Sequence, residues 1–149
     1  MRKIIQNRML KMLFAAACFS TPHEGNISMD KSKKNILGTS LVKCADQTGY
    51  YRDGYCASGP EDSGVHVVCS QVTKEFLEFS KKHGNDLITP RPEYKFKGLK
   101  PGDRWCLCAS RWQEAFLQKV APPVILEATH ERALQILRID DLQKSCVVD

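Results

Sequence analysis

Two segments of the chain carry the apolar pattern of β-strands. Residues 65–72 place apolar side chains on both alternating faces, which is typical of a strand buried on both sides. In residues 104–109 the side chains of Arg104, Cys106 and Cys108 share one face, and Trp105 and Leu107 point the other way. We therefore expect two strands, the first of them in the centre of a sheet.

Helical spacing of apolar residues follows each of these strands. Thr73 is a suitable N-cap for a helix over residues 74–83, and Gly84 would end that helix. Ser110 and Gln113 fit a capping box at the start of a second helix, which a Pro-Pro pair ends. Two strand–helix units in succession are thus predicted.

The C-terminal third repeats the pattern in shorter pieces. Residues 124–128 are predicted as a third strand, with Thr129 as the N-cap of a short helix that ends at Leu134. A strand-like segment over residues 136–139 precedes a helical turn that begins at Asp140. Three to four helices and several short strands are therefore expected.

Two long connections separate these elements. Residues 44–64 are dense in Gly, Asp, Ser and Pro and predict a structured loop, and residues 85–102 predict an extended connection. Because the strands are short and the first loop holds no helix, we predict an α+β domain with a mixed sheet and three to four helices. The alternation of strands and helices leaves an α/β fold with a mostly parallel sheet as the alternative.

Size and charge bound the function. The chain has 149 residues and a net charge of +5, and this whole excess lies in residues 1–34, so that residues 35–149 are neutral overall. We expect a leader or disordered tail over residues 1–34, with a flexible lead-in at residues 29–34, and one globular domain over residues 35–149. A neutral domain argues against nucleic acid as a partner, and no apolar run approaches the roughly 20 residues of a membrane span.

The N-terminal residues leave the cellular location of the protein open. A basic stretch precedes an apolar run of about eight residues, Met12 to Phe19, which resembles a short signal peptide with Cys18 as a possible lipid anchor. The alternative is that translation starts at Met29. We expect a cytoplasmic protein, with export or lipid anchoring through the leader as the alternative.

That choice decides the chemistry of the six cysteines that follow the leader. In an oxidising compartment they would form disulfides of open connectivity, and in a reducing one they would be core residues, metal ligands or reactive thiols. A disulfide between Cys106 and Cys108 is disfavoured because an extended backbone holds their Cβ atoms too far apart. The six are Cys44, Cys56, Cys69, Cys106, Cys108 and Cys146.

A set of short motifs spans the predicted domain: Asn35-Ile-Leu-Gly38, Gly49-Tyr-Tyr-Arg-Asp-Gly54, Gly59-Pro-Glu-Asp62, Gly84-Asn-Asp-Leu87, Gly98-Leu-Lys-Pro-Gly-Asp-Arg-Trp-Cys-Leu-Cys108, Ala121-Pro-Pro-Val124 and Glu127-Ala-Thr-His130. Together with His66 and Cys69 they resemble the bacterial family catalogued as domain of unknown function 2237. The resemblance covers about residues 35–142 and begins just after Met29, which favours translation from that methionine. It implies a family but no activity.

Thiol chemistry is the first candidate function. Cys106 is our preferred thiolate, with Arg104 beside it on the same face and Cys108 as a resolving partner through a third cysteine. The neighbouring strand could present His66 as the base. His130 lies where a strand ends, which is where pockets in such sheets are found.

Zinc binding by a structural or catalytic site is the second candidate. Cys106 and Cys108 could supply two thiolates, and Cys56 and Cys69 the other two, with Cys44 or His66 as substitutes. No Cys-x-x-Cys pair is present, and His66 and Cys69 are expected to face opposite sides of their strand, so that only one of them would join.

In the third interpretation the cysteines are core residues of a structural or interaction module, because free cysteine is among the most buried residue types. Function would then lie elsewhere, with a small molecule bound at a rim formed by Arg52, Asp53 and Asp62 in the first long loop. The alternative for these residues is ordinary turn chemistry. The loop over residues 91–104 is also locally basic and is either solvated or a site for a small anion. The reaction, the substrate and the oligomeric state stay open.

Overall fold

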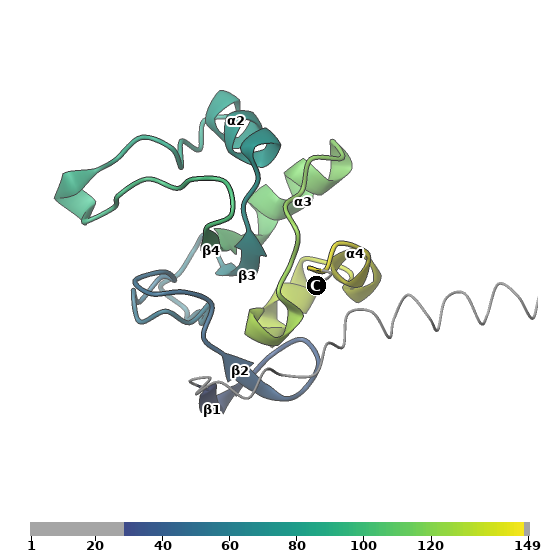
Figure 1. Ribbon diagram of the computed structural model, residues 1–149. Helices are drawn as coiled ribbons and strands as arrows, with labels where there is room; N and C mark the ends of the chain where they lie inside the picture. Colours follow the sequence, from purple (N-terminus) through teal and green to yellow (C-terminus); the bar gives the residue numbers. More distant parts are fainter. Residues whose placement is uncertain (1–28, 148–149) are drawn as a thin grey trace, which may run out of the picture.

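The computed structural model describes residues 29–147 (Figure 1). Residues 1–28 of the leader expected over residues 1–34 lie outside this range. The elements in chain order are β1 (Met29–Lys34), β2 (Ser40–Val42), β3 (His66–Gln71), α2 (Lys74–Lys82), η1 (Pro92–Tyr94), β4 (Arg104–Cys108), α3 (Ala109–Leu117), η2 (Leu126–Ala128), η3 (Glu131–Gln135) and α4 (Ile139–Lys144), where η marks a 3-10 helix.

The described strands form two antiparallel pairs, β1 with β2 and β3 with β4. In the second pair Cys69 lies opposite Cys106 and His66 lies opposite Cys108, with a register shift between His66 and Val68. The predicted α+β class is confirmed, and the parallel sheet of the α/β alternative is not formed. Residues 29–34, expected as a flexible lead-in, are instead paired with β2 as strand β1.

An irregular segment occupies the other edge of β3. The Ile125 N–H donates to the Cys69 carbonyl at 2.9 Å, and the His130 N–H donates to the Val67 carbonyl at 3.1 Å. The hydroxyl of Thr129 accepts from the Cys69 N–H at 3.2 Å and donates to the Ile125 carbonyl at 2.9 Å. β3 is therefore central, as predicted, but residues 124–128 form no strand, because this side-chain bridge and η2 replace a regular ladder.

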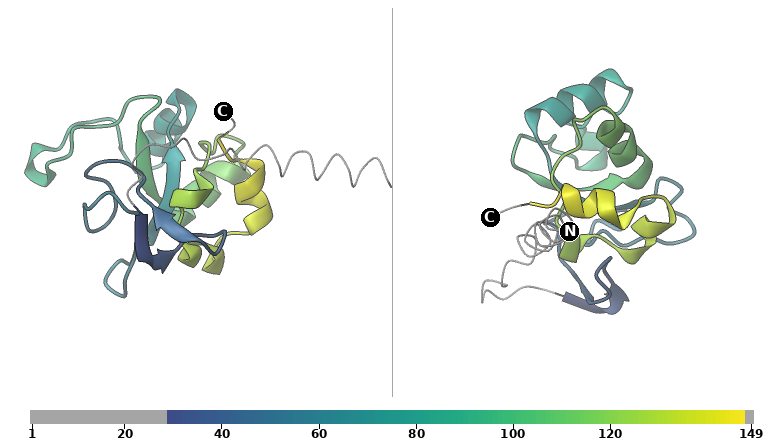
Figure 2. Two further views of the ribbon diagram at one scale, coloured as in Figure 1. Left: turned by 60° about the horizontal axis from the view of Figure 1, so that its bottom comes forward. Right: turned by 90° about the vertical axis from the view of Figure 1, so that its right-hand side faces the viewer.

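The helices cover one side of the β3–β4 pair, with α2 and α3 above it and α4 against the C-terminal segment (Figures 1 and 2). Trp112 of α3 is fully buried, and its indole N–H donates to the Pro122 carbonyl at 3.1 Å. This burial of apolar surface is the main force that holds the layers together. Other buried members of the core are Val67, Val68, Phe76, Leu77, Leu107, Val124 and Leu142.

The ends of the elements test the capping predictions. Thr73 caps α2 as expected, accepting from the Phe76 N–H at 3.1 Å. The capping box at Ser110 is wrong, because β4 runs directly into α3 and Cys108 itself is the N-cap residue. The N-cap of η3 is His130 and not Thr129, whose hydroxyl is used in the bridge to β3.

The remaining C-terminal segment also differs in part. Residues 136–139 are not a strand, since they turn into α4, and the helical turn expected from Asp140 begins one residue earlier. Among residues 29–147, no helix has both the length and the apolar character to cross a bilayer. Residues 85–102 extend away from the body and carry η1 (Figure 1), as expected of an extended connection.

Candidate functional site

Two disulfides attach the first long loop to the central strands. Cys44 is bonded to Cys69 of β3, and Cys56 is bonded to Cys106 of β4. Since Cys69 and Cys106 lie opposite each other in the strand pair, the two disulfides lie next to each other. All four cysteines are buried. The loop between them is therefore fixed over the β3–β4 pair.

This pairing corrects the preferred nucleophile. The predicted alternation is right, because residues 104–108 are extended and Cys106 faces the loop. In the structure, however, the Cys106 sulfur is bonded to Cys56, so it carries no thiol, and the residue is only 1% exposed. The proposed resolving exchange between Cys106 and Cys108 has no free partner here for the same reason.

Within residues 29–147, Cys108 is the free cysteine. It is half-buried, ends β4 and is the N-cap residue of α3, where its side chain makes no capping hydrogen bond. His66, the first residue of β3, lies opposite it. A hydrogen bond with Cys108 is the largest influence on the imidazole and, against the opposing effect of burial, raises the pKa of His66 to about 9. The ring is thus cationic at neutral pH.

A buried carboxylate holds the other side of this ring. Nδ1 of His66 lies 2.7 Å from Oδ1 of Asp62, whose side chain is 0% exposed. The second oxygen, Oδ2, accepts from the His66 N–H at 2.9 Å and from the Ser58 hydroxyl at 3.0 Å. Burial opposes ionisation of Asp62, but the bonds from the backbone and ring of His66 outweigh it and lower the pKa of Asp62. We call Asp62, His66 and Cys108 the triad.

Two further features position the triad. The guanidinium of Arg132 donates to the Ser58 hydroxyl and to the Gly59 carbonyl, both at 2.9 Å, and so ties the Asp62 loop to η3. A Cβ on Gly64 would lie 2.5 Å from Cε1 of His66, so the ring occupies the space of the missing side chain. An acid that orients an imidazole, which in turn pairs with a thiol, is the arrangement of cysteine nucleophiles in hydrolases.

A cavity of about 390 Å³ opens beside His66, between the first loop, the extended segment and β4. The guanidinium of Arg52 lies 5.1 Å from the Trp105 ring centroid, and the Tyr50 ring stacks on His66 at 6.2 Å. Cys108 is not in the wall, so the cavity reaches the triad through His66. Lining side chains that bear charge or a ring include Tyr50, Arg52, His66, Asp86, Arg91 and Trp105.

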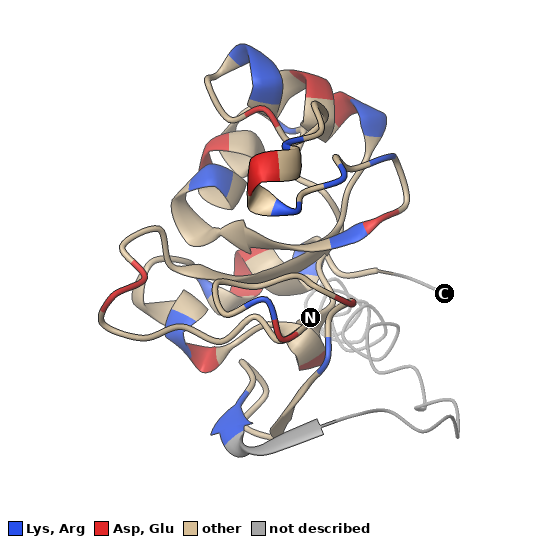
Figure 3. Cartoon of the chain, turned by 90° about the vertical axis from the view of Figure 1, so that its left-hand side faces the viewer, with Lys and Arg blue, Asp and Glu red and all other residues tan. Residues whose placement is uncertain are grey.

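The basic groups of the cavity outnumber its acid. Asp86 is engaged by the hydroxyl of Thr89 at 2.6 Å, which with backbone N–H bonds lowers its pKa to about 2. Arg52, Arg91 and the charged His66 leave the wall net positive. Beyond the cavity, acidic residues are interspersed with basic ones on this face (Figure 3), so the positive charge is local.

Two other predicted residues lie elsewhere. Arg104 is exposed and pairs in register with Gln71, at the opposite end of β4 from Cys108. His130 lies along the far edge of β3, where its Nδ1 accepts from the Arg132 N–H at 3.0 Å and burial lowers its pKa. Neither residue is brought to the triad.

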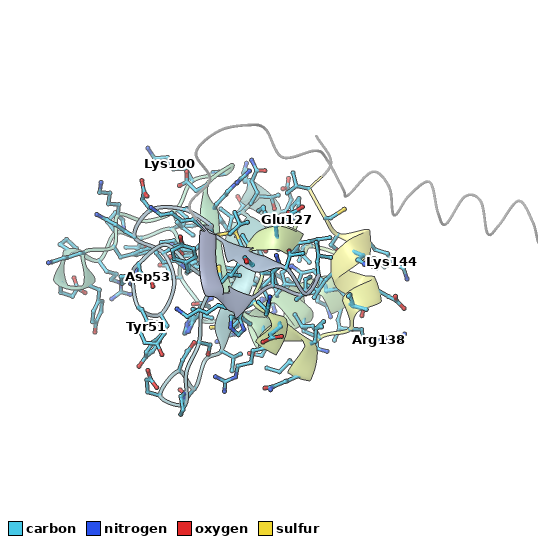
Figure 4. The ribbon with its side chains drawn as sticks, turned by 90° about the horizontal axis from the view of Figure 1, so that it is seen from below. Tyr51, Asp53, Lys100, Glu127, Arg138 and Lys144 are labelled. Atoms are coloured by element: carbon cyan, nitrogen blue, oxygen red, sulfur yellow. A yellow bond between two sulfur atoms is a disulfide. The ribbon has the colours of Figure 1, made fainter. Side chains whose placement is uncertain are left out.

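The predicted rim of the first loop is divided. Arg52 lines the cavity, and Asp62 belongs to the triad instead of a ligand rim. Asp53 accepts from the Tyr55 N–H at 3.0 Å in a turn and lies on the outer loop with Tyr51 (Figure 4). Turn chemistry therefore describes Asp53, as the alternative interpretation had it.

The predicted metal ligands come together only in part. The sulfurs of Cys44, Cys56 and Cys69 lie within 4.8 Å of one another, and Cys106 is bonded to Cys56. Cys108 lies at His66 and is not in this group, so Cys44 takes the place that the prediction assigned to Cys108. With the four sulfurs paired in disulfides, no thiolate ligand is present.

Several residues of the site are not predicted by any sequence pattern considered above. Ser58, Gly64 and Arg132 were not singled out, and Arg132 is 74 residues away from Ser58. The spacing of Asp62 and His66, four residues apart in a turn-rich loop, is a usable signal, since such loops bring acid and ring together.

A family model matches most of the chain. Residues 34–146 match the model of a family described as an uncharacterized protein conserved in bacteria, DUF2237. The match includes both disulfides, the triad and the cavity, and it confirms the resemblance inferred from the motifs. None of the curated proteins matches the chain.

Proposed function

The chain belongs to the DUF2237 family, and we propose that it is a thiol enzyme in which Cys108 is the nucleophile. The observation that carries this proposal is geometric: Asp62, which accepts a hydrogen bond from Ser58, holds the His66 ring, and His66 lies opposite Cys108 in the β3–β4 pair. Burial of a carboxylate costs free energy unless the carboxylate is paired. Asp62 is paired with His66, and its bonds hold the imidazole ring in place.

Two sources of positive charge lie beside Cys108, and the thiolate is the nucleophilic form of cysteine. The adjacent imidazole is cationic at neutral pH and can form an ion pair with it. The thiol also stands at the start of α3, a helix of nine residues, whose N-terminus carries a partial positive charge. The His66 imidazolium and the N-terminus of α3 both act on the Cys108 sulfur. Cys106 is in a disulfide and has neither neighbour.

The two ring nitrogens of His66 have different partners. Nδ1 faces the Asp62 carboxylate, which leaves Nε2 for the thiol side. In the reaction that we propose, the Cys108 thiolate attacks an electrophilic carbon, a carbon–sulfur bond forms, and the leaving group departs with the proton of Nε2. The neutral imidazole then takes a proton from water, whose oxygen displaces the sulfur and restores the thiolate.

The cavity indicates the substrate class. Its volume of about 390 Å³ suits a small molecule. Arg52 and Arg91 with the imidazolium supply positive charge, and Tyr50 and Trp105 supply aromatic walls. We infer a small substrate with a carboxylate or phosphate group, whose electrophilic carbon lies near His66.

Alkylation of the oxidised full-length protein tests the nucleophile. Iodoacetamide is added across pH 5 to 9, and the modified peptide is identified by mass spectrometry. We expect a single adduct on Cys108, formed below neutral pH faster than on a peptide thiol, and none in Cys108→Ser. His66→Gln should abolish the low-pH reaction. A rate equal to that of the peptide at each pH would refute an activated thiol.

Iodoacetate against iodoacetamide tests the substrate class with matched probes, since they differ in one carboxylate. We expect Cys108 to prefer iodoacetate over iodoacetamide relative to the peptide thiol. Arg52→Gln and Arg91→Gln should each reduce that preference at least threefold and leave the iodoacetamide rate unchanged. An unchanged ratio in both variants would contradict an anionic substrate but leave the nucleophile standing.

A further inference from the structure

We propose that the two buried disulfides are the oxidised form of a tetrathiolate zinc site, and that their reduction creates a place for one Zn²⁺ ion. The ligands are Cys44, Cys56, Cys69 and Cys106. The site lies beside the triad and does not depend on the function proposed for Cys108.

The positions of the sulfurs carry this inference. Those of Cys44, Cys56 and Cys69 lie within 4.8 Å of one another although they belong to two different disulfides. In a tetrahedral site with Zn–S bonds of about 2.3 Å, neighbouring sulfurs are roughly 3.8 Å apart. The sulfurs of Cys56 and Cys69, which belong to different disulfides, are thus already near this spacing. The bonded sulfurs within each pair have to part, and the Cys106 sulfur, which lies outside this group of three, has to turn toward it.

This movement of the sulfurs requires little change in the backbone. The Cα atoms of the bonded pairs are 5.8 Å and 5.2 Å apart, so a rotation of the side chains separates the sulfurs while the strands stay in place. Cys69 and Cys106 are fixed opposite each other in the β3–β4 pair. Cys44 and Cys56 come from the loop, which closes over the other side of the ion.

The chemistry balances with a dithiol reductant. Each disulfide takes two electrons and two protons from one dithiol, which leaves as a disulfide, and four thiols result. Zn²⁺ binding then releases the four protons, because thiolates are the ligands. Four soft sulfur ligands select zinc over magnesium or calcium. Burial adds to the affinity, because closely spaced thiolates in an apolar interior need a cation.

The consequence is a loop attached to the sheet in either redox state. Disulfides hold residues 44–56 over β3 and β4 under oxidising conditions, and a zinc ion would hold them under reducing conditions. The position of Gly49 and Tyr50 beside His66 and the cavity would then be kept in both.

The experiment uses the full chain, reduced anaerobically with a phosphine and freed of metal. Zn²⁺ is added, and bound metal is measured by native mass spectrometry. We expect one zinc per chain after reduction and none in the oxidised protein. Co²⁺ in place of Zn²⁺ should give the strong visible bands and the sulfur-to-cobalt charge transfer of a tetrahedral tetrathiolate.

Variants separate this site from the triad. Cys108→Ser should still bind one zinc, and Cys44→Ser should lose the four-sulfur cobalt spectrum. Should Cys44→Ser fail to fold, alkylation of the reduced wild type replaces it: Zn²⁺ should protect four cysteines, identified as the cluster, and leave Cys108 reactive. Reduced wild-type protein that stays metal-free at micromolar Zn²⁺, or a cobalt spectrum with fewer than four sulfurs, overturns the proposal.

Discussion

Removal of the Cys56–Cys106 disulfide in the double variant Cys56→Ala/Cys106→Ala should destabilise the fold by about 4 kcal/mol through chain entropy alone. The disulfide joins residues 50 apart in sequence, and the gain in freedom of the unfolded chain grows with the logarithm of that separation. The Cys44–Cys69 disulfide, with a separation of 25, gives about 3.5 kcal/mol by the same relation. Either loss is large against a typical total of roughly 5–15 kcal/mol.

A second contribution comes from packing, because Cys56 and Cys106 are 0% and 1% exposed. Truncation of both to alanine leaves a small cavity, for which about 1–2 kcal/mol is added. The two contributions can be separated by urea unfolding in oxidising buffer and in phosphine with a chelator. In reducing buffer neither protein has the disulfide, so the variant differs from wild type by packing only.

The assay follows the fluorescence of the two tryptophans, of which Trp112 is fully buried and changes environment on unfolding. We expect a loss of about 5–6 kcal/mol in oxidising buffer and about 1–2 kcal/mol in reducing buffer. Ser110→Ala, at an exposed position of α3, serves as the control and should change neither value by more than about 0.5 kcal/mol. Equal losses in the two buffers would refute the pairing of Cys56 with Cys106.

Three further outcomes are expected. The folded-state pKa of His66 is raised to about 9, so its ion pair stabilises the fold fully below the unfolded pKa of about 6.5, and this stabilisation is lost as pH rises through 9. Between pH 6 and 10 the melting temperature should therefore fall more in wild type than in His66→Gln. Parallel curves for the two proteins would contradict this. Gly64→Ala, whose Cβ would meet the His66 ring, should slow Cys108 alkylation at least tenfold, while Ser63→Ala should not; equal rates would show that the ring can move freely. Trp112→Ala should cost about 3–5 kcal/mol in urea unfolding, and a loss below about 1 kcal/mol would mean that Trp112 is not in the core.

Strands β3 and β4 and the first helix were predictable because their signals are local. The two-sided apolar pattern of residues 66–71 marks a central strand, and Thr73 with the following spacing marks α2. The prediction of a third strand over residues 124–128 is wrong for a reason that lies outside these residues. Its edge of β3 is satisfied by the Thr129 hydroxyl, so the segment turns into η2 without a ladder.

The candidate site was predictable by residue type and not by partner. His66, Asp62 and Cys108 were all named, but Asp62 was assigned to a rim and Cys106 was preferred over Cys108. In the pattern of alternation the two cysteines are equivalent, since both point to the face that carries Arg104. Only the loop that carries Cys56 distinguishes them, by bonding one and leaving the other beside His66.

The sequence by itself determined the α+β class, the strands of the β3–β4 pair and the family, because apolar periodicity and short motifs are formed by consecutive residues. The tertiary structure decided which sulfurs meet, which one stays a thiol and which acid holds the ring. Each of these depends on a contact between segments far apart in the chain, such as Cys56 with Cys106 or Ser58 with Arg132. No local pattern specifies such contacts, because they arise only when the loop closes over the sheet.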